Sequence, residues 1–252
     1  MDKYFNVNIE FDRQKVDNIV VSTIRNRGKG YVCSIESNNL TIANIDPEFN
    51  KVVNESLVNI CDGSVLARII GFVHKKSYRS YIGADLFLSF IEKRAFKQYF
   101  LGNTQEVLDG LKKNLSIKDP NIQNMRFVPL PFKRVEEFDY EAIAADINKY
   151  QPDIIWVSLG APKQEIFMHR LLPHLEKGIM FGFGAIFNFN AGTGSVKRAP
   201  QWMRKWKVEW LYRAFEEPKK NIPRYYRFIC RLPGLISQEY RQVRKQRQRE
   251  QR

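Results

Sequence analysis

The sequence predicts an α/β protein with a Rossmann-like, mostly parallel sheet covered by helices, followed by a basic helical C-terminal appendage. The first observation behind this prediction is that apolar runs of strand length alternate with amphipathic stretches of helix length, a pattern typical of parallel sheets. The second is charge: residues 197–252 carry 17 lysines and arginines against five acidic residues, a net +12 of the whole chain's +14. We therefore expect an α/β catalytic domain at 1–196 and the appendage at 197–252.

The first half of the chain switches repeatedly between the period of a strand and that of a helix. Residues 4–11 alternate between polar and apolar side chains, as a half-buried strand does. Residues 12–26 place their apolar side chains on one helical face, and residues 31–35 form an apolar run of strand length. The remaining elements expected here are a short extended segment at 40–44, a helix from Asp46-Pro47 to about 58, an extended apolar segment at 65–72, and an amphipathic helix at 84–94.

The second half repeats the alternation and adds glycine turns. Strands are expected at 98–101, 127–130, 154–159 and 179–183, and helices after Asn103, at 140–149 and from 163. Asn103 and Glu106 have the spacing of a capping box. Gly102, Gly160 and Gly184 each follow a strand. Because ligands bind at the carboxyl ends of parallel strands, the site is expected at these turns.

Composition excludes several classes of protein. Its 252 residues, 44% hydrophobic and 13% aromatic, can form a large core, which excludes global disorder. Cys33, Cys61 and Cys230 have neither metal-ligand spacing nor a disulfide pattern, which favours a reducing compartment. No apolar run approaches the roughly 18 residues of a spanning helix, and the first residues are too polar for a signal peptide. A cytoplasmic protein without a metal site is expected.

Asp62 is the first candidate for chemistry. It follows a short apolar stretch and precedes Gly63, so we expect it at the edge of a loop. A carboxylate there can act as a general base on a hydroxyl nucleophile. The competing interpretation is a turn aspartate, because Asp-Gly is a common turn dipeptide.

The segment Gly160 to Glu165 is the second candidate. Gly160 allows close backbone approach, Pro162 starts a helix, and Lys163 and Gln164 can reach a phosphate or a sugar at the helix N-terminus. The alternative is an ordinary loop with a solvated helix start, in which Glu165 only complements the helix dipole. The segment is neither a Walker A loop nor a dinucleotide fingerprint.

The C-terminal appendage is the third candidate. Trp202, Trp206 and Trp210 are four residues apart and are predicted to lie on one helix face; packing against the sheet domain as core is the favoured interpretation. Its arginines instead match phosphate geometry. The segment after Ile236 has few apolar side chains and is expected to remain solvated.

Five blocks in order resemble the WecG/TagA/CpsF glycosyltransferases. They are GAPKQE at 160–165, GFGAIFNFNAG at 182–192, RAPQW at 198–202, VEWLYR at 208–213 and EEP..RY at 216–225. The family typically shows G-x-P-x-Q-E, G-x-x-F-[DN]-x-x-A-G, R-A-P-x-W, L-E-W-L-Y-R and E-P-x-R-x-x-R-Y. Asn44 before a helix, Asp62-Gly63 and the segment from Gly83 fit more loosely. Ile42 and Ser80 stand where the family usually has Thr and Arg, and Lys219-Lys220 replaces an Arg, which bears on the donor sugar more than on the reaction.

The resemblance implies an inverting glycosyltransferase that needs no cofactor. It would move N-acetylmannosamine or a related hexose from a UDP-sugar donor to a polyprenyl-diphosphate-linked acceptor in teichoic-acid, capsule or exopolysaccharide assembly. Asp62 would be the base, and Arg213 and Arg224 would stabilise the leaving diphosphate. The residues that would complete donor binding are Asn44, Gly160, Pro162, Gln164, Glu165 and Gly184.

The acceptor implied by this resemblance lies in a membrane. The enzyme would therefore dock on an anionic membrane surface through its basic appendage, peripherally at the inner face of the cell membrane. A homo-oligomer is compatible with this expectation. The alternative from charge alone is a nucleic-acid-binding protein that uses the basic aromatic tail; the family resemblance removes the need for a nucleic-acid partner.

Overall fold

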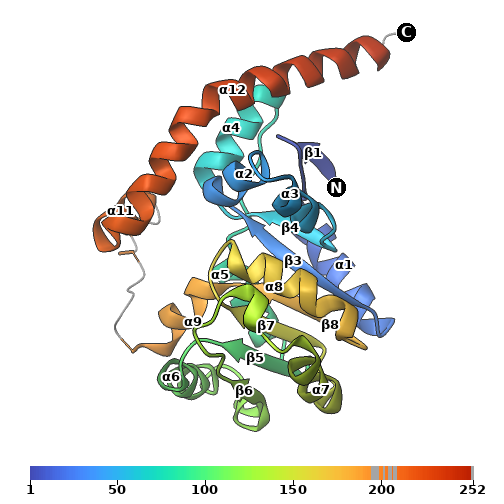
Figure 1. Ribbon diagram of the computed structural model, residues 1–252, viewed down its shortest axis with the longest axis vertical. Helices are drawn as coiled ribbons and strands as arrows, with labels where there is room; N and C mark the ends of the chain where they lie inside the picture. Colours follow the sequence, from blue (N-terminus) through green and yellow to red (C-terminus); the bar gives the residue numbers. More distant parts are fainter. Residues whose placement is uncertain (194–198, 201, 204–205, 207–208, 251–252) are drawn as a thin grey trace.

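A six-stranded, fully parallel sheet forms the centre of the molecule, in the order β4-β3-β8-β7-β5-β6 (Figure 1). The computed structural model describes residues 1–193, 199–200, 202–203, 206 and 209–250. The strands are β3 (Lys29–Ile35), β4 (Val58–Cys61), β5 (Gln98–Gly102), β6 (Arg126–Val128), β7 (Ile154–Ser158) and β8 (Gly178–Gly182). The predicted α/β, Rossmann-like class is confirmed.

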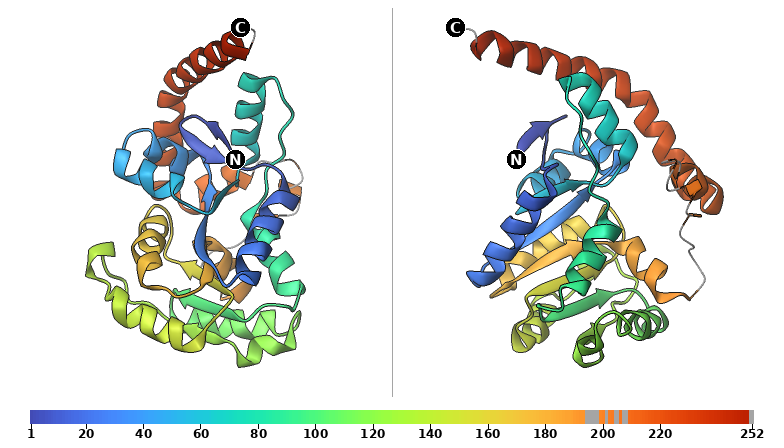
Figure 2. Two further views of the ribbon diagram at one scale, coloured as in Figure 1. Left: turned by 90° about the vertical axis from the view of Figure 1, so that its right-hand side faces the viewer. Right: turned by 180° about the vertical axis from the view of Figure 1, so that it is seen from behind.

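Helices cover both faces of this sheet (Figure 2). Alternate strand residues point to opposite faces, so Ile155 and Val157 belong to one buried cluster and Trp156 to the other. The first cluster is closed by α2 (Ser37–Ala43), α3 (Pro47–Asn54), α4 (Ser64–His74), α7 (Tyr140–Tyr150) and α8 (Lys163–Leu171). The second is closed by α1 (Arg13–Arg25), α5 (Gly83–Glu92), α6 (Gln105–Leu115) and α9 (Gly184–Ala191).

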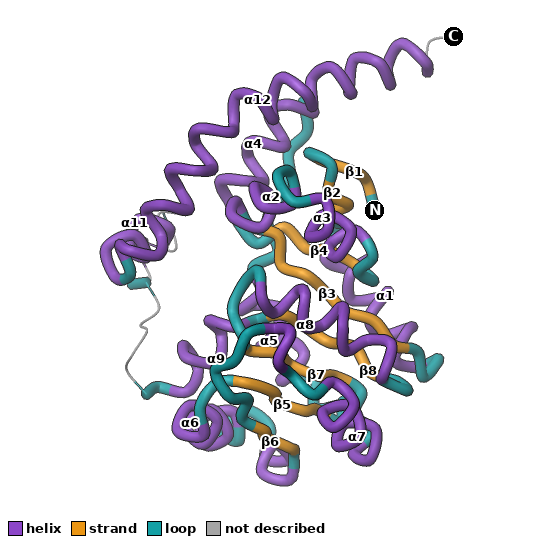
Figure 3. The backbone as a smooth tube through the Cα atoms, viewed as in Figure 1, coloured by secondary structure: helices purple, strands orange, loops and turns teal. Residues whose placement is uncertain are grey.

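Several segments differ from the sequence prediction (Figure 3). Residues 40–44 and 65–72, expected to be extended, lie in or at the end of helices α2 and α4. In α4, Leu66, Ile70 and Val73 are buried at helical spacing, and their β-branched and apolar character masked that period. The helix that begins at Pro47 ends at Asn54, not near 58, because Val58 already pairs with β3.

One chain reversal and one helix cap were also mispredicted. The strand expected at 4–11 is a hairpin of β1 (Asp2–Tyr4) and β2 (Val7–Ile9), which turns at Phe5 and Asn6 with φ of 48° and 64°. Asn103 does not cap α6; the Thr104 hydroxyl accepts the hydrogen bond from the Val107 N–H.

The C-terminal appendage is helical, as predicted, through α11 (Glu209–Glu216) and α12 (Pro218–Glu250). In Figure 1, α12 runs across α4 and past the N-terminal hairpin. The expectation that nothing after Ile236 is buried is wrong. Glu239 and Val243 are 3% and 9% exposed, and the Glu239 carboxylate accepts hydrogen bonds from the Phe5 N–H and from His74, both at 2.8 Å. The expected domain boundary at 196/197 lies outside the described residues.

Candidate active site

Asp62 lies directly after β4, at the carboxyl edge of the sheet, and its carboxylate is held on two sides. The Ser34 hydroxyl, from the neighbouring strand β3, donates to Asp62 Oδ2 at 2.8 Å. The backbone N–H of Gly83, at the start of α5, donates to the same carboxylate. A Cβ at Gly83 would lie 3.2 Å from Asp62 Oδ2 and 3.0 Å from the Phe183 ring, so a side chain there would crowd the carboxylate and the ring.

The electrostatics of Asp62 suit a base. Burial raises the pKa of its carboxyl above the ordinary value, and the nearby Glu36 adds to the rise. The Ser34 hydrogen bond, the positive charge of Arg213 and the Gly83 N–H each oppose this effect. The side chain is therefore a partly desolvated carboxylate, as general-base catalysis near neutral pH requires.

Gln164 joins the two glycine turns that follow β7 and β8. Its Oε1 accepts the N–H of Gly160 at 3.2 Å and that of Gly184 at 3.1 Å, and its Nε2 donates to the carbonyl of Gly182 at 2.9 Å. A Cβ at Gly184 would lie 2.8 Å from the Gly160 nitrogen. Gln164 is 5% exposed and its amide holds these two loops together, so its predicted contact with a ligand stays a prediction.

Glu165 is fully buried, so the solvated helix start considered above is wrong. Its Oε1 accepts from Asn39 Nδ2 and Gln164 Nε2, both at 3.1 Å. Burial raises the pKa of this carboxyl to about 7, against hydrogen bonds from Gln164 and Asn39 that lower it. Among the described residues, Glu165 Oε2 and Asn39 Oδ1 are buried without a hydrogen-bond partner. Lys163, the other predicted contact, instead donates to the Lys133 carbonyl.

The appendage reaches the same edge of the sheet. Arg224 of α12 donates to the carbonyl of Ala161, next to Pro162, at 3.3 Å. Arg213 of α11 lies over the Phe189 ring and pairs with Glu209 at 3.3 Å. The charge of Arg213 lowers the pKa of Asp62, so the appendage supplies cations to the surroundings of the candidate base.

Asn44 is not brought to this group. It caps the end of α2, where its Nδ2 donates to the carbonyls of Phe5 and Leu40 at 2.9 Å and its Oδ1 accepts from Asn6 at 3.1 Å. This amide fastens the N-terminal hairpin to α2. The donor-binding role of Asn44 stays a prediction, and in this structure its polar atoms are engaged in the hairpin.

Sequence reasoning missed four polar residues of the site. Ser34 lies near the end of β3, Glu36 directly follows that strand, and the Asn39 amide donates to the Ser34 carbonyl at 3.0 Å. Ser158, at the end of β7, donates to the Gly184 carbonyl at 2.9 Å. A polar residue at the end of a predicted strand is the one signal that Ser34 and Ser158 offered.

The expectation of buried tryptophans is wrong: Trp202, Trp206 and Trp210 are 62%, 76% and 46% exposed.

The described residues contain neither a metal cluster nor a helix that could span a membrane. No cluster of three or more histidine, cysteine or acidic side chains there has the arrangement of a metal site. No described helix combines the length and apolar character needed to cross a bilayer.

Comparison with known proteins supports the resemblance found in the sequence. The model of the glycosyl transferase WecG/TagA/CpsF family matches residues 4–249. An N-acetylglucosaminyldiphosphoundecaprenol N-acetyl-beta-D-mannosaminyltransferase of Bacillus subtilis (strain 168) is 27% identical over 188 residues, 71% of each chain. The protein of the same name from Staphylococcus aureus (strain MW2) is 25% identical over 250 residues, 90% of this chain and 92% of its own. With a family match over nearly its whole length and a parallel sheet whose strand ends carry the family's motifs, the chain belongs to the WecG/TagA/CpsF family of glycosyl transferases.

Proposed function

We propose that this protein is an inverting glycosyltransferase that moves a sugar from a UDP-sugar to a polyprenyl-diphosphate-linked sugar. The names of the two relatives, which specify a diphosphoundecaprenol acceptor and N-acetylmannosaminyl transfer, support this class of acceptor and an N-acetylmannosamine-like donor sugar. The products would enter teichoic-acid, capsule or exopolysaccharide assembly. The observation that carries the proposal is that Asp62 at the carboxyl edge of the sheet feels the charge of Arg213, while the joined glycine turns after β7 and β8 lie on the same edge and Arg224 contacts one of them.

The reaction needs a base on the acceptor and positive charge on the leaving group. Asp62 takes the proton of the acceptor hydroxyl as that oxygen forms the new bond to the anomeric carbon, from the face opposite the leaving diphosphate. Arg213 and Arg224 offset the charge that develops on UDP, and the N-terminal turn of α9 at Gly184 favours an anion in the same way. Gly160, Pro162 and Gly184 shape the donor pocket, and Gln164 and Glu165 hold that shape from behind.

The appendage is proposed to dock the enzyme on the membrane that holds the acceptor. On α12, Ile222, Tyr226 and Ile229 are exposed by 55%, 71% and 64%, and they recur at helical spacing on the side away from the buried Phe228. Exposed apolar side chains amid a high positive charge suit the interface of an anionic bilayer. The enzyme would then work peripherally at the inner face of the cell membrane.

A donor screen tests the reaction. Purified protein is incubated with a synthetic polyprenyl-diphosphate-linked N-acetylglucosamine and each of a panel of UDP-sugars, and UDP release is measured. Release that depends on both the acceptor and one UDP-sugar is expected, and the Asp62→Asn protein serves as the blank. Absence of acceptor-dependent release with every donor sugar would overturn the proposal.

A further inference from the structure

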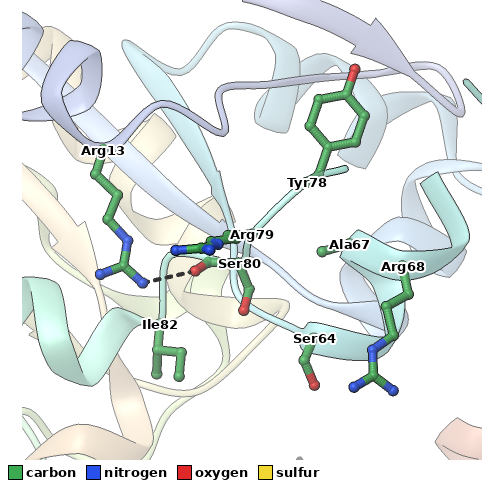
Figure 4. A pocket seen from close by; sticks show the side chains of 8 residues that line it. All are labelled: Arg13, Ser64, Ala67, Arg68, Tyr78, Arg79, Ser80 and Ile82. Atoms are coloured by element: carbon green, nitrogen blue, oxygen red, sulfur yellow. Dashed lines mark hydrogen bonds between the residues drawn. The ribbon is translucent and has the colours of Figure 1, made fainter. Parts of the chain in front are cut away.

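A hollow of about 400 Å³ opens beside Asp62, on the side of the sheet edge formed by β4. Its lining comes from the start of α1, the first turns of α4 and the loop that leads into α5 (Figure 4). Ser64, which begins α4, is two residues beyond Asp62, and Ile82 immediately precedes Gly83, whose N–H bonds the Asp62 carboxylate. The hollow and the candidate base therefore share the same two turns.

The lining is strongly positive. Figure 4 shows the guanidinium groups of Arg13 and Arg79 at one side of the hollow, that of Arg68 at the other, and the Ser64 hydroxyl between them. No aspartate or glutamate lines it. Arg13 is oriented by the Ser80 carbonyl at 3.0 Å and by the Tyr81 ring. Guanidinium groups gathered without a counter-charge repel one another, and an anion bound between them would relieve that repulsion.

These arginines differ from others on the surface. Arg126, Arg134 and Arg170 each pair with a carboxylate within 4.0 Å. Within the described part of the chain, neither Arg68 nor Arg79 has an ion pair. Two unpaired guanidinium groups, a third held in place by a carbonyl, and the N-terminus of an eleven-residue helix together favour a ligand with more than one negative charge.

We propose that this hollow binds the diphosphate of the lipid-linked acceptor, an inference that rests on the proposed function. Both the donor and the acceptor contain a diphosphate ester, so the position of the hollow decides which of the two it would bind. The loops at Gly160 and Gly184 follow β7 and β8, whereas the hollow adjoins β4, two strands from β8 across the sheet. Asp62 follows β4 and is two residues before Ser64 of the hollow, and its Gly83 partner adjoins Phe183 in the loop after β8. A base must face the acceptor hydroxyl on one side and the donor on the other, so the diphosphate beyond Asp62 belongs to the acceptor.

The exposed face of α4 agrees with a lipid substrate. Val65 and Phe72 are 41% and 73% exposed, and they are seven residues apart, with Arg68 between them on the same helix face. A diphosphate held at Arg68 would leave the first isoprene units beside these apolar side chains. The same helix would therefore contact both the charged and the apolar parts of the acceptor.

The test separates acceptor from donor. The probes are farnesyl-diphosphate-linked N-acetylglucosamine and UDP, each titrated calorimetrically into wild-type protein and into Arg68→Ala/Arg79→Ala. The double variant is expected to bind the farnesyl probe at least about tenfold more weakly, the effect of losing charge-assisted hydrogen bonds, with UDP affinity within about twofold of wild type. Arg79→Lys should bind the farnesyl probe more weakly than wild type but more tightly than the double variant, because lysine keeps the charge without the planar guanidinium fork. The matched control is Arg25→Ala, an exposed arginine on α1 outside the hollow, which should change neither affinity.

Three outcomes would overturn the proposal. UDP affinity that falls as much as acceptor affinity would assign the hollow to the nucleotide. Acceptor affinity that is unchanged in the double variant, or equally reduced in Arg25→Ala, would remove any specific role of the pocket. A wild-type protein that binds no farnesyl probe would refute it as well. Failure of the proposed reaction is distinct: the wild type would then bind the farnesyl probe through Arg68 and Arg79 but release no UDP with any donor sugar.

Discussion

Asp62 is the residue on which the proposed reaction depends most directly. Replacing it with Asn preserves the size of the side chain and an oxygen that accepts the Ser34 hydroxyl, but it removes the proton acceptor. We expect Asp62→Asn to fold normally and to bind UDP-sugar, with turnover at least about a hundredfold lower, the smaller end of general-base effects. Steady-state kinetics beside circular dichroism measures both. Turnover close to wild type would exclude Asp62 as the base.

Glu165 is expected to make the free energy of unfolding depend on pH, and Glu165→Gln should remove that dependence. Its pKa is raised in the folded protein from 4.5 to about 7, so the neutral form is favoured by folding. This contribution is complete below pH 4.5 and is lost as pH rises through about 7, a total of roughly 3 kcal/mol. Asn39 already donates its Nδ2 to Glu165 Oε1, and its Oδ1 has no hydrogen-bond partner. A proton on Glu165 Oε2 would supply a donor for that Oδ1.

Glu165→Gln mimics the protonated acid without titrating. We expect its free energy of unfolding to match wild type at about pH 4, below the unfolded pKa of 4.5, and to exceed it at about pH 8, above the folded pKa of about 7, measured by urea denaturation at both values. Because every other titrating group is common to the two proteins, their difference isolates Glu165. A difference that does not change with pH would show that Glu165 is ionised throughout this range in the folded protein.

Residues differ in how far the sequence reveals them. Asp62 follows an apolar strand and precedes a glycine, and Gly184 lies in a glycine turn after an apolar strand. This local pattern predicts a residue at the carboxyl end of a strand, where ligands bind in parallel sheets. Glu165 has the sequence context of an exposed first helical turn, and it is buried by tertiary contacts, among them the Asn39 amide of α2. Ser34 offers only its polar side chain near a strand end, and Asn39 carries no local signal, because their roles depend on partners 28 and 126 residues away.

At the scale of elements, the loops after β7 and β8 are held together where Gly160 and Gly184 approach each other. A methyl group at Gly184 would lie 2.8 Å from the Gly160 nitrogen and 3.0 Å from Gln164 Oε1. Gly184→Ala should therefore push these loops apart and raise the KM for UDP-sugar, by tenfold or more if about two hydrogen bonds are lost. The control is Gly234→Ala on α12, where a Cβ meets nothing within 4 Å. Equal donor KM in the two variants would contradict the joined-loop arrangement.

The end of α12 is tested by two truncations. Ending the chain after Ile236 removes Glu239 and leaves the Phe5 N–H without its buried acceptor, a cost of about 1–3 kcal/mol in the free energy of unfolding. Ending it after Arg244 keeps Glu239 and Val243 and should be close to neutral. Thermal or urea unfolding of both proteins measures the contrast. Equal stability would mean that the contact of α12 with the hairpin contributes little.

The elements that the sequence predicted well are those with an unambiguous period. The helix from 163, the strand at 98–101 and the helix from 140 are confirmed within a residue or two. The segments 40–44 and 65–72 were mispredicted because short apolar runs fit a strand and a buried helix equally well. Tertiary burial decided between them: α4 packs beneath α12, a partner more than 150 residues away that no local pattern indicates.

For the molecule as a whole, the uneven charge and the exposed face of α12 predict salt-sensitive membrane binding. Ile222→Ser/Tyr226→Ser/Ile229→Ser should fold normally, since all three side chains are mostly exposed. It should bind anionic liposomes at least about tenfold more weakly, because each apolar side chain inserted into the interface contributes on the order of 1 kcal/mol. Raising the salt concentration should weaken the wild type as well. Co-sedimentation that is indifferent to both changes would refute docking through α12.

The contacts of α12 also set an order of events during synthesis. Phe5 leaves the ribosome near the beginning of translation, yet the carboxylate that accepts its N–H is on residue 239, and the arginine that reaches Ala161 is on residue 224. Strands β3 to β8 can pair before then, so a nascent chain can hold a formed sheet and the candidate base without the cations of the appendage. A fragment released early would thus lack the arginines proposed to offset the leaving-group charge, and the proposed glycosyl transfer would begin only when nearly the entire chain has been made.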